Sequence, residues 1–213
     1  MDRELVDLAV ALFDIGCVKF GSFTLASGKQ SPIYIDLRLL ASYPTVLTKV
    51  AQAMGACLTQ HGFVFDTDQN SDTIVFQRIA AIPTAGLPIG TAIAVTHLWS
   101  LIYPQKEVKD HGTGRLVEGV FNKGDTVVVV DDLITTAKSK FEAITKLEKM
   151  QLKIYDILVL LDRQQGGGEE LAERGYTLHA VMTVHQLLTA LHESARIDDQ
   201  VYHELLSYFN IKD

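Results

Sequence analysis

Residues 126–139 read TVVVVDDLITTAKS, and the pattern in and around this stretch decides the fold class. The β-branched apolar run at 126–130 is typical of a strand buried on both faces of a sheet. An amphipathic helix is predicted over 139–150 from apolar residues at helical spacing, and a second apolar run predicts a strand over 154–161. A strand, a helix and a strand in succession form a βαβ unit, which requires parallel strands.

Further elements extend this alternation in both directions along the chain. Helices are predicted over 3–13, 43–60, 169–174 and 198–209, and strands over 73–82 and 177–183. Residues 22–36 are predicted to be extended around a turn at 27–28, and the apolar stretch 87–103 is predicted to be a buried core helix. The alternation indicates an α/β fold with a central, mostly parallel sheet flanked by helices.

The composition narrows the class of protein further. The chain has 213 residues, 47% of them hydrophobic, which is typical of a single packed domain spanning 1–213. The net charge of −7 argues against a nucleic-acid partner, because such a partner requires a basic surface. Cys17 and Cys57 have no CxxC spacing and there is no signal-peptide pattern, so we expect a cytoplasmic location. The stretch 87–103 contains polar residues and predicts a core helix rather than a membrane span.

The candidate site begins at the end of the strand predicted over 126–130. Asp131 and Asp132 follow that strand, and ligands of open α/β sheets bind beyond the carboxyl ends of the strands. The turn at 135–139 offers hydroxyls, backbone N–H groups and the positive end of a helix dipole, which together suit a phosphate. The carboxylates would repel a phosphate and suit sugar hydroxyls instead. The structural alternative, in which the acids only end a strand and Ser139 only caps a helix, explains less of the string.

This string resembles the phosphoribosyl-diphosphate binding motif of the type I phosphoribosyltransferases. Four further blocks resemble orotate phosphoribosyltransferases in the same order along the chain: 20–28, 31–38, 106–119 and 160–167. The resemblance covers nearly the whole chain and implies the type I phosphoribosyltransferase fold. In that fold, 1–40 would form a small hood beside the central sheet, and 103–119 would form a flexible loop.

The resemblance also implies a reaction. Members of the family are glycosyltransferases that move ribose 5-phosphate from phosphoribosyl diphosphate to orotate, forming orotidine 5′-phosphate and diphosphate in UMP biosynthesis. Mg²⁺ is the implied cofactor, held through substrate and water rather than by a protein metal site. The implied partners are these two substrates and a second copy of the chain, so we expect a homodimer and neither a nucleic acid nor a membrane.

The resemblance assigns roles to individual residues of this sequence. The implied catalytic residues are Lys109, His111, Asp131 and Asp132. The implied substrate-binding residues are Tyr34, Lys106, Thr135, Thr136, Ala137, Lys138, Ser139 and Arg163. The two aspartates would hold the ribose hydroxyls, 135–139 would cradle the 5-phosphate, and Arg163 and Tyr34 would meet orotate. The loop with Lys109 would act across the dimer interface on the diphosphate.

Several residues depart from the family pattern. The departures are Ala26 and Gln105, where the family has cations, the turn residues Thr84 and Ala85, and Ala137 and Lys138 in the phosphate turn. Each lost charge-assisted contact to a polyanion would cost about 1.5–3 kcal/mol. The polar insertion at 66–71 is also unusual for the family. Two hypotheses remain: an active enzyme with an altered site, and a catalytically impaired or inactive member that binds ligands or regulates.

Overall fold

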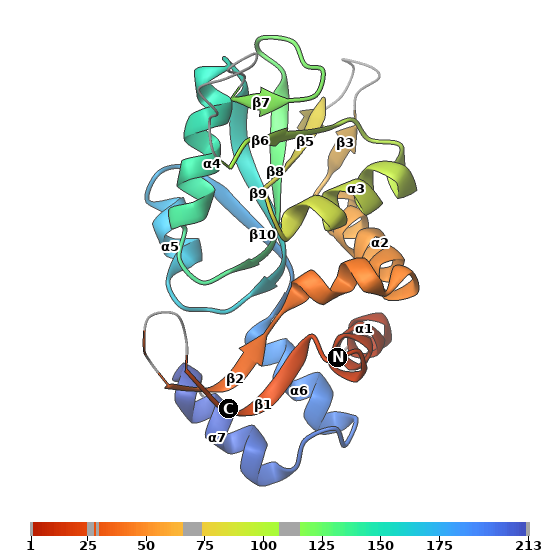
Figure 1. Cartoon of the computed structure of the whole chain (residues 1–213), viewed down its shortest axis with the longest axis vertical. Coiled ribbons are helices and arrows are strands. Elements are labelled where there is room, and N and C mark those ends of the chain that lie inside the picture. Colours follow the sequence, from red (N-terminus) through yellow and green to blue (C-terminus); the bar gives the residue numbers. More distant parts are fainter. Residues whose placement is uncertain (1, 25–27, 29, 66–73, 107–115, 212–213) are drawn as a thin grey trace.

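The computed structural model describes residues 2–24, 28, 30–65, 74–106 and 116–211, which form a central sheet flanked by helices and a smaller part below it (Figure 1). The helices are α1 (Arg3–Asp14), α2 (Pro44–Gln60), α3 (Gly86–His97), α4 (Lys138–Lys149), α5 (Gly167–Ala172), α6 (Val184–Glu193) and α7 (Asp199–Phe209), with a 3-10 helix η1 at Leu37–Ser42. The strands are β1 (Val18–Thr24), β2 (Gln30–Ile35), β3 (Phe63–Phe65), β4 (Ile74–Phe76), β5 (Arg78–Ala81), β6 (Leu101–Pro104), β7 (Val117–Glu118), β8 (Thr126–Ile134), β9 (Lys153–Asp162) and β10 (Thr177–Thr183).

The central sheet has six strands in the order β10-β9-β8-β5-β6-β7. All neighbouring strands are parallel except β6 and β7, which form an antiparallel pair at one edge. The predicted α/β class with a mostly parallel sheet is therefore confirmed. Since β8 lies between β5 and β9, the acidic pair and the turn after it follow a central strand of the sheet rather than an edge strand.

Helices cover both faces of this sheet, α2 and α3 on one side and α4 and α5 on the other (Figure 1). Alternate valines of β8 enter two separate cores, because successive side chains of a strand point to opposite faces. Val128 and Val130 pack with residues of α2 and α3, whereas Val127 and Val129 pack with residues of α4. The all-apolar run in the sequence follows from this double burial.

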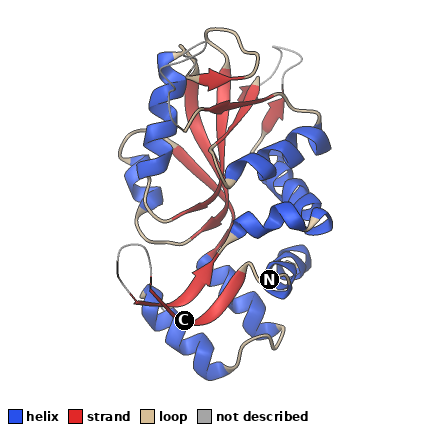
Figure 2. Ribbon diagram, viewed as in Figure 1, coloured by secondary structure: helices blue, strands red, loops and turns tan. Residues whose placement is uncertain are grey.

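A smaller layer lies below the sheet and corresponds to the predicted hood. The antiparallel pair β1–β2 packs beside α1, α6 and α7 (Figure 2). The N-terminal segment 1–40 thus supplies the hairpin, and the C-terminal helices α6 and α7 complete the layer. Buried residues of both layers, from Leu8 to Phe209, form one continuous cluster. The division of the chain into one domain stays a prediction.

Three sequence expectations were wrong in detail. The stretch 87–103 is not one helix, since α3 ends at His97, Leu98 adopts a left-handed conformation and β6 follows. The strand predicted over 73–82 is two strands, β4 and β5, in different sheets. The strand β8 does not end at the aspartates but continues to Ile134, paired with Asp162 of β9. A short apolar run is compatible with either a buried helix or a buried strand, so periodicity alone could not divide 87–103 correctly.

Two predicted segments lie partly or wholly outside the described residues. They are the polar insertion 66–71 and most of the loop 103–119, of which the antiparallel stem β6–β7 is described. Among the described residues, no helix is both long enough and apolar enough to cross a bilayer.

Candidate functional site

The acidic pair at the end of β8 is organised by a buried lysine. Lys140 Nζ lies 2.7 Å from Asp131 Oδ2, and both side chains are less than 10% exposed. The same ammonium donates to the carbonyl of Leu133 at 2.6 Å. Asp131 Oδ1 accepts the backbone N–H of Asp132 at 2.9 Å, so both oxygens of Asp131 have a partner inside the protein. Lys140 thereby ties the end of β8 to the first turn of α4.

Asp132 has a different environment from its neighbour. Its side chain accepts the backbone N–H of Leu133 at 2.8 Å. Burial and, to a smaller extent, the negative charge of Asp131 raise the pKa of Asp132 to about 7. Asp132 therefore binds a proton more readily than an exposed carboxyl does, whereas Asp131 is paired with Lys140. Of the two, Asp132 is the less buried and the freer to accept a hydrogen bond from a ligand hydroxyl.

The turn 135–137 leads directly into α4, as the sequence predicts for a phosphate cradle. Thr136, Lys138 and Ser139 are exposed there, and Thr135 is half-buried. These residues line a surface hollow of about 440 Å³ together with Lys140. Ser139 does not cap the helix, because α4 begins at Lys138 after Ala137, which has no capping side chain. The hollow, the hydroxyls and the helix N-terminus together can hold an anion of phosphate size.

Arg163 extends from the end of β9 next to this turn. Its backbone N–H donates to the carbonyl of Ile134 at 3.0 Å, which fixes the neighbouring ends of β8 and β9 together. Its guanidinium lies over the ring of Phe209 at 5.8 Å from the centroid. The buried Nε of Arg163 is the one side-chain nitrogen or oxygen without a hydrogen-bond partner among the buried atoms that the structure describes. A buried donor of this kind is suited to a ligand oxygen.

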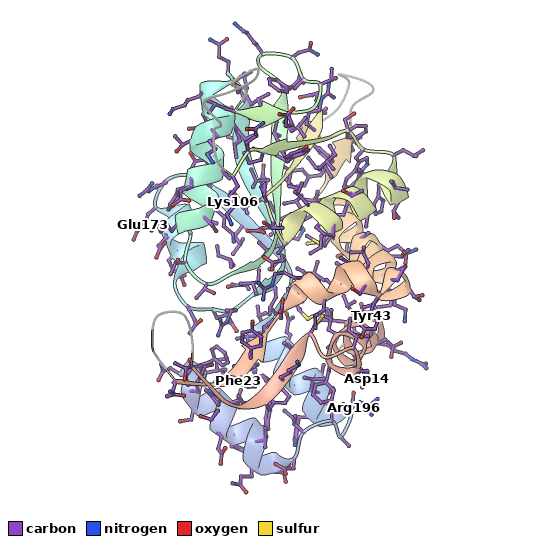
Figure 3. All side chains as sticks on the ribbon, viewed as in Figure 1. Asp14, Phe23, Tyr43, Lys106, Glu173 and Arg196 are labelled. Carbon is purple, nitrogen blue, oxygen red and sulfur yellow. The ribbon has the colours of Figure 1, made fainter. Side chains whose placement is uncertain are left out.

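Tyr34 lies on β2 in the hood. Its ring centroid is 5.5 Å from that of Phe23, and its hydroxyl accepts from Arg38 at 3.2 Å (Phe23 is labelled in Figure 3). The hood helix α7 contacts β2, and Phe209 of α7 meets Arg163. The hood, to which Tyr34 belongs, thus meets Arg163 through Phe209 of α7. The role of Tyr34 as a wall for the pyrimidine stays a prediction.

The stem of the predicted loop is fastened to α4. Lys146 Nζ donates to the carbonyl of Gln105 at 2.6 Å and to that of Lys106 at 3.1 Å. The Gln105 side chain donates to Glu118 at 2.5 Å, so this residue joins the two strands of the stem. Lys106 is exposed (Figure 3). Lys109 and His111 of the predicted catalytic set lie outside the described residues, as does Ala26.

The turn with Thr84 and Ala85 comes close to the acidic pair. It leads into α3, and a Cβ added at Gly86 would lie 3.1 Å from Asp131 Oδ1 and from the carbonyl of Val130. Glycine at this position lets the start of α3 approach β8 closely, because a Cβ there would require Asp131 or the Val130 carbonyl to shift by a few tenths of an ångström. The departures at Thr84 and Ala85 therefore lie at the same end of the sheet as the acids, where a ligand would meet them.

Sequence reasoning missed three charged residues of the site: Lys140, Lys146 and Glu170. Lys140 is in phase with Ile144 and Leu147 on the buried face of α4, and a charge in such a position signals a buried partner. The other two act on backbone atoms of distant segments, which no sequence pattern reveals.

Comparisons with known proteins agree on one family. The bifunctional enzyme PyrF/PyrE of Nostoc sp. is 39% identical over 200 residues, which are 94% of this chain and 39% of that protein. The orotate phosphoribosyltransferase of Pyrococcus furiosus is 33% identical over 190 residues, which are 89% of this chain and 97% of that protein.

The chain belongs to the orotate phosphoribosyltransferase family. The solved structure of Leishmania donovani UMP synthase, with a TM-score of 0.82 and 40% identity, covers 96% of the chain and confirms the predicted fold. No protein-family model matches the chain. The chain spans about two fifths of the length of the bifunctional relatives. In this fold the turn after β8, Asp132 and Arg163 lie at one end of the sheet.

The ion pair predicts a large and specific stability effect. Replacing Lys140→Met leaves Asp131 buried without a cation and lowers the free energy of unfolding by about 3–5 kcal/mol at pH 8. The double variant Lys140→Met/Asp131→Asn recovers most of that loss, because no buried charge remains. Urea denaturation measures both. Lys138→Met, at an exposed position of the same helix, is the control and changes stability by about 0.5 kcal/mol or less. Equal losses in the single and double variants would contradict the pairing.

The raised pKa of Asp132 predicts that this residue lowers the stability of the folded protein in a pH-dependent way. Between about pH 4 and pH 7 the folded protein binds a proton at Asp132 that the unfolded chain has released, so stability falls as pH rises through this range. Asp132→Asn removes the effect, and its melting temperature exceeds that of the wild type by more at pH 8 than at pH 5. Thermal denaturation at the two pH values measures the difference. A gap that is equal at both, or larger at pH 5, would contradict the assignment.

Proposed function

We propose that this chain transfers ribose 5-phosphate from phosphoribosyl diphosphate to orotate, giving orotidine 5′-phosphate and diphosphate. The observation that carries the proposal is the meeting of three features at one end of the sheet. These are an acidic pair, a phosphate-sized turn at a helix N-terminus, and the unpartnered buried guanidinium nitrogen of Arg163. The acidic pair suits the hydroxyls of a sugar, the turn suits a phosphate, and Arg163 suits an anionic base. The family of the chain supports the assignment.

The chemistry asks for positioning and for control of charge. As the bond to diphosphate breaks, positive charge develops on the ribose ring, and fixed groups stabilise that state best when they are already in place. Asp132 accepts a ribose hydroxyl, and Asp131, held by Lys140, supplies a fixed negative charge behind it. The turn at 135–139 holds the 5-phosphate, so the ribose is anchored at two points while its anomeric carbon reacts.

Mg²⁺ fits this site as an ion carried by the substrate. Among the described residues, no three His, Cys, Asp or Glu side chains come together as a metal site. Asp132 is the carboxylate that would hold such an ion through water, together with diphosphate and ribose oxygens. When bound, Mg²⁺ supplies charge neutralisation to the leaving diphosphate.

Arg163 supplies recognition of orotate. Burial lowers the pKa of this guanidinium, which nevertheless stays charged because arginine titrates far above neutral pH. A planar fork with an unpartnered Nε matches a carboxylate such as that of orotate. We assign Lys106, Lys109 and His111 to the diphosphate, as the family resemblance implies, with Lys109 acting on the neighbouring subunit.

The surface of α3 supports a homodimer. Thr91, Val95 and Leu98 follow one another at helical spacing on its exposed side, and Val95 and Leu98 are 73% and 84% exposed. A second copy would cover these side chains and gain the free energy of burying them. The chain continues from this face through β6 into the loop that carries Lys109, so a contact here directs the loop toward a partner.

A cytoplasmic location completes the proposal. Both cysteines are free and buried, and burial raises the pKa of each thiol, as suits a reducing compartment.

The activity test is consumption of orotate, followed by its ultraviolet absorbance, with phosphoribosyl diphosphate and Mg²⁺. The wild type turns over, and Arg163→Lys raises the KM for orotate about 10- to 100-fold, because the bidentate fork is lost. Arg196→Lys is the control, since Arg196 pairs with Asp14 at the exposed edge of the hood (Figure 3). Absence of turnover in the wild type would instead support the ligand-binding or regulatory alternative.

The dimer test uses one added charge on α3. Leu98→Glu dissociates the dimer, which light scattering after gel filtration measures, and lowers turnover because the partner's loop is lost. Val120→Glu is the matched control, since Val120 is 86% exposed and belongs to the segment between β7 and β8 rather than to α3. A monomeric wild type, or a Leu98→Glu protein that stays dimeric, would contradict this interface.

A further inference from the structure

One backbone N–H of the phosphate turn already donates a hydrogen bond to a carboxylate of the protein itself. The backbone N–H of Ala137, the residue before α4, donates to Glu170 Oε2 at 2.8 Å. Glu170 belongs to α5, 33 residues further along the chain. Ala137 has no side-chain oxygen with which to cap α4, so the Glu170 carboxylate supplies the missing cap from outside the helix.

The backbone of Glu170 is held firmly beside the turn. Gly167, at the start of α5, packs so closely that an added Cβ would lie 3.0 Å from the carbonyl of Thr135 and 2.5 Å from the Ile134 side chain. The N–H of Glu170 donates to the carbonyl of Gly166 at 3.0 Å. The start of α5 therefore packs directly against the turn, which places the Glu170 side chain within reach of Ala137.

A carboxylate and a phosphate compete for such a donor. Both are anions, and the N–H groups and dipole at a helix N-terminus favour either of them. The 5-phosphate that the turn is proposed to hold would meet a negative charge already bound at Ala137. We propose that Glu170 is an internal competitor of the 5-phosphate and sets the affinity of the chain for phosphoribosyl diphosphate. This proposal rests on the function proposed above.

A second hollow beside the turn could receive the Glu170 carboxylate when a phosphate displaces it. This hollow of about 380 Å³ adjoins the phosphate turn and is lined by Glu170, Lys138, Arg174 and other residues of α4. Arg174 lies there with its guanidinium 3.8 Å from the centroid of the Phe141 ring. Once a phosphate has taken the N–H of Ala137, Lys138 and Arg174 would donate hydrogen bonds to the Glu170 carboxylate. The binding of phosphate and the rotation of Glu170 are thus one exchange.

The competing explanation is that Glu170 is only a helix cap. Removing a cap lowers stability and leaves ligand affinity unchanged or weaker. Removing a competitor raises affinity for the 5-phosphate even though the same cap is lost. Affinity and stability therefore change in opposite directions only if Glu170 competes with the ligand.

The experiment compares Glu170→Ala and Glu170→Gln with the wild type. Calorimetry measures the Kd of phosphoribosyl diphosphate with Mg²⁺, and thermal denaturation measures stability. We expect Glu170→Ala to bind about tenfold more tightly, the factor of one charge-assisted hydrogen bond, and to melt at a lower temperature. Glu170→Gln keeps an oxygen that can cap Ala137, so it folds like the wild type and shows a smaller gain in affinity.

Two controls isolate the 5-phosphate. Glu173→Gln makes the same charge change at the exposed end of α5 and leaves the Kd unchanged (Figure 3). Inorganic diphosphate lacks the 5-phosphate, so its Kd changes less than twofold in every variant. A gain of the same size for diphosphate would show a general charge effect and overturn the proposal.

The outcomes separate this inference from the proposed function. Equal or weaker binding of phosphoribosyl diphosphate by both Glu170 variants overturns the competitor, whatever the turnover. Absence of binding in all proteins overturns it as well. If the Glu170 variants bind phosphoribosyl diphosphate more tightly but no protein turns over orotate, the proposed activity is overturned. The role of Glu170 as a competitor is then still supported.

Discussion

The contact between Lys140 and Asp131 fixes the geometry on which the rest of the site depends. Its 2.7 Å distance joins the last part of β8 to the first turn of α4, and the second bond of Lys140, to Leu133, fixes the connecting backbone. A buried charge pair has a strict geometry, because either partner alone would be costly in the protein interior. The turn between the two elements is therefore anchored at both of its ends, and Thr136, Lys138 and Ser139 are exposed there.

Charge is distributed unevenly around this turn. Asp131 pairs with Lys140, burial raises the pKa of Asp132, and the Glu170 carboxylate accepts the N–H of Ala137. An acidic chain that binds a polyanion must shield or move the carboxylates near the ligand. Here an ion pair shields Asp131, a raised pKa favours the protonated form of Asp132, and rotation of the side chain is proposed to move Glu170. The net charge of −7 therefore matters less for ligand binding than the pairing of a few carboxylates with nearby cations.

Much of the fold was predictable from residues that obey local rules. The β-branched run before Asp131 predicted a central strand, and the helix at 139–150 was placed within one residue of α4. The prediction failed at 87–103, where an apolar stretch holds a helix and a strand, and it missed α6, which completes the hood together with α7. The placement of Asp131, Asp132, 135–139 and Arg163 at one end of the sheet followed from parallel topology, because the carboxyl ends of parallel strands meet at one edge.

The sequence by itself determined the class of fold, the family and the order of the phosphate turn after a buried strand, since periodicity and turn chemistry act over a few neighbouring residues. Tertiary structure alone decided which charges meet. Lys140 finds Asp131 across a turn, Lys146 holds the carbonyl of Gln105 from another helix, and Glu170 reaches Ala137 from α5. These contacts depend on distances between elements that only the packed sheet sets, and for that reason no pattern along the chain could reveal them.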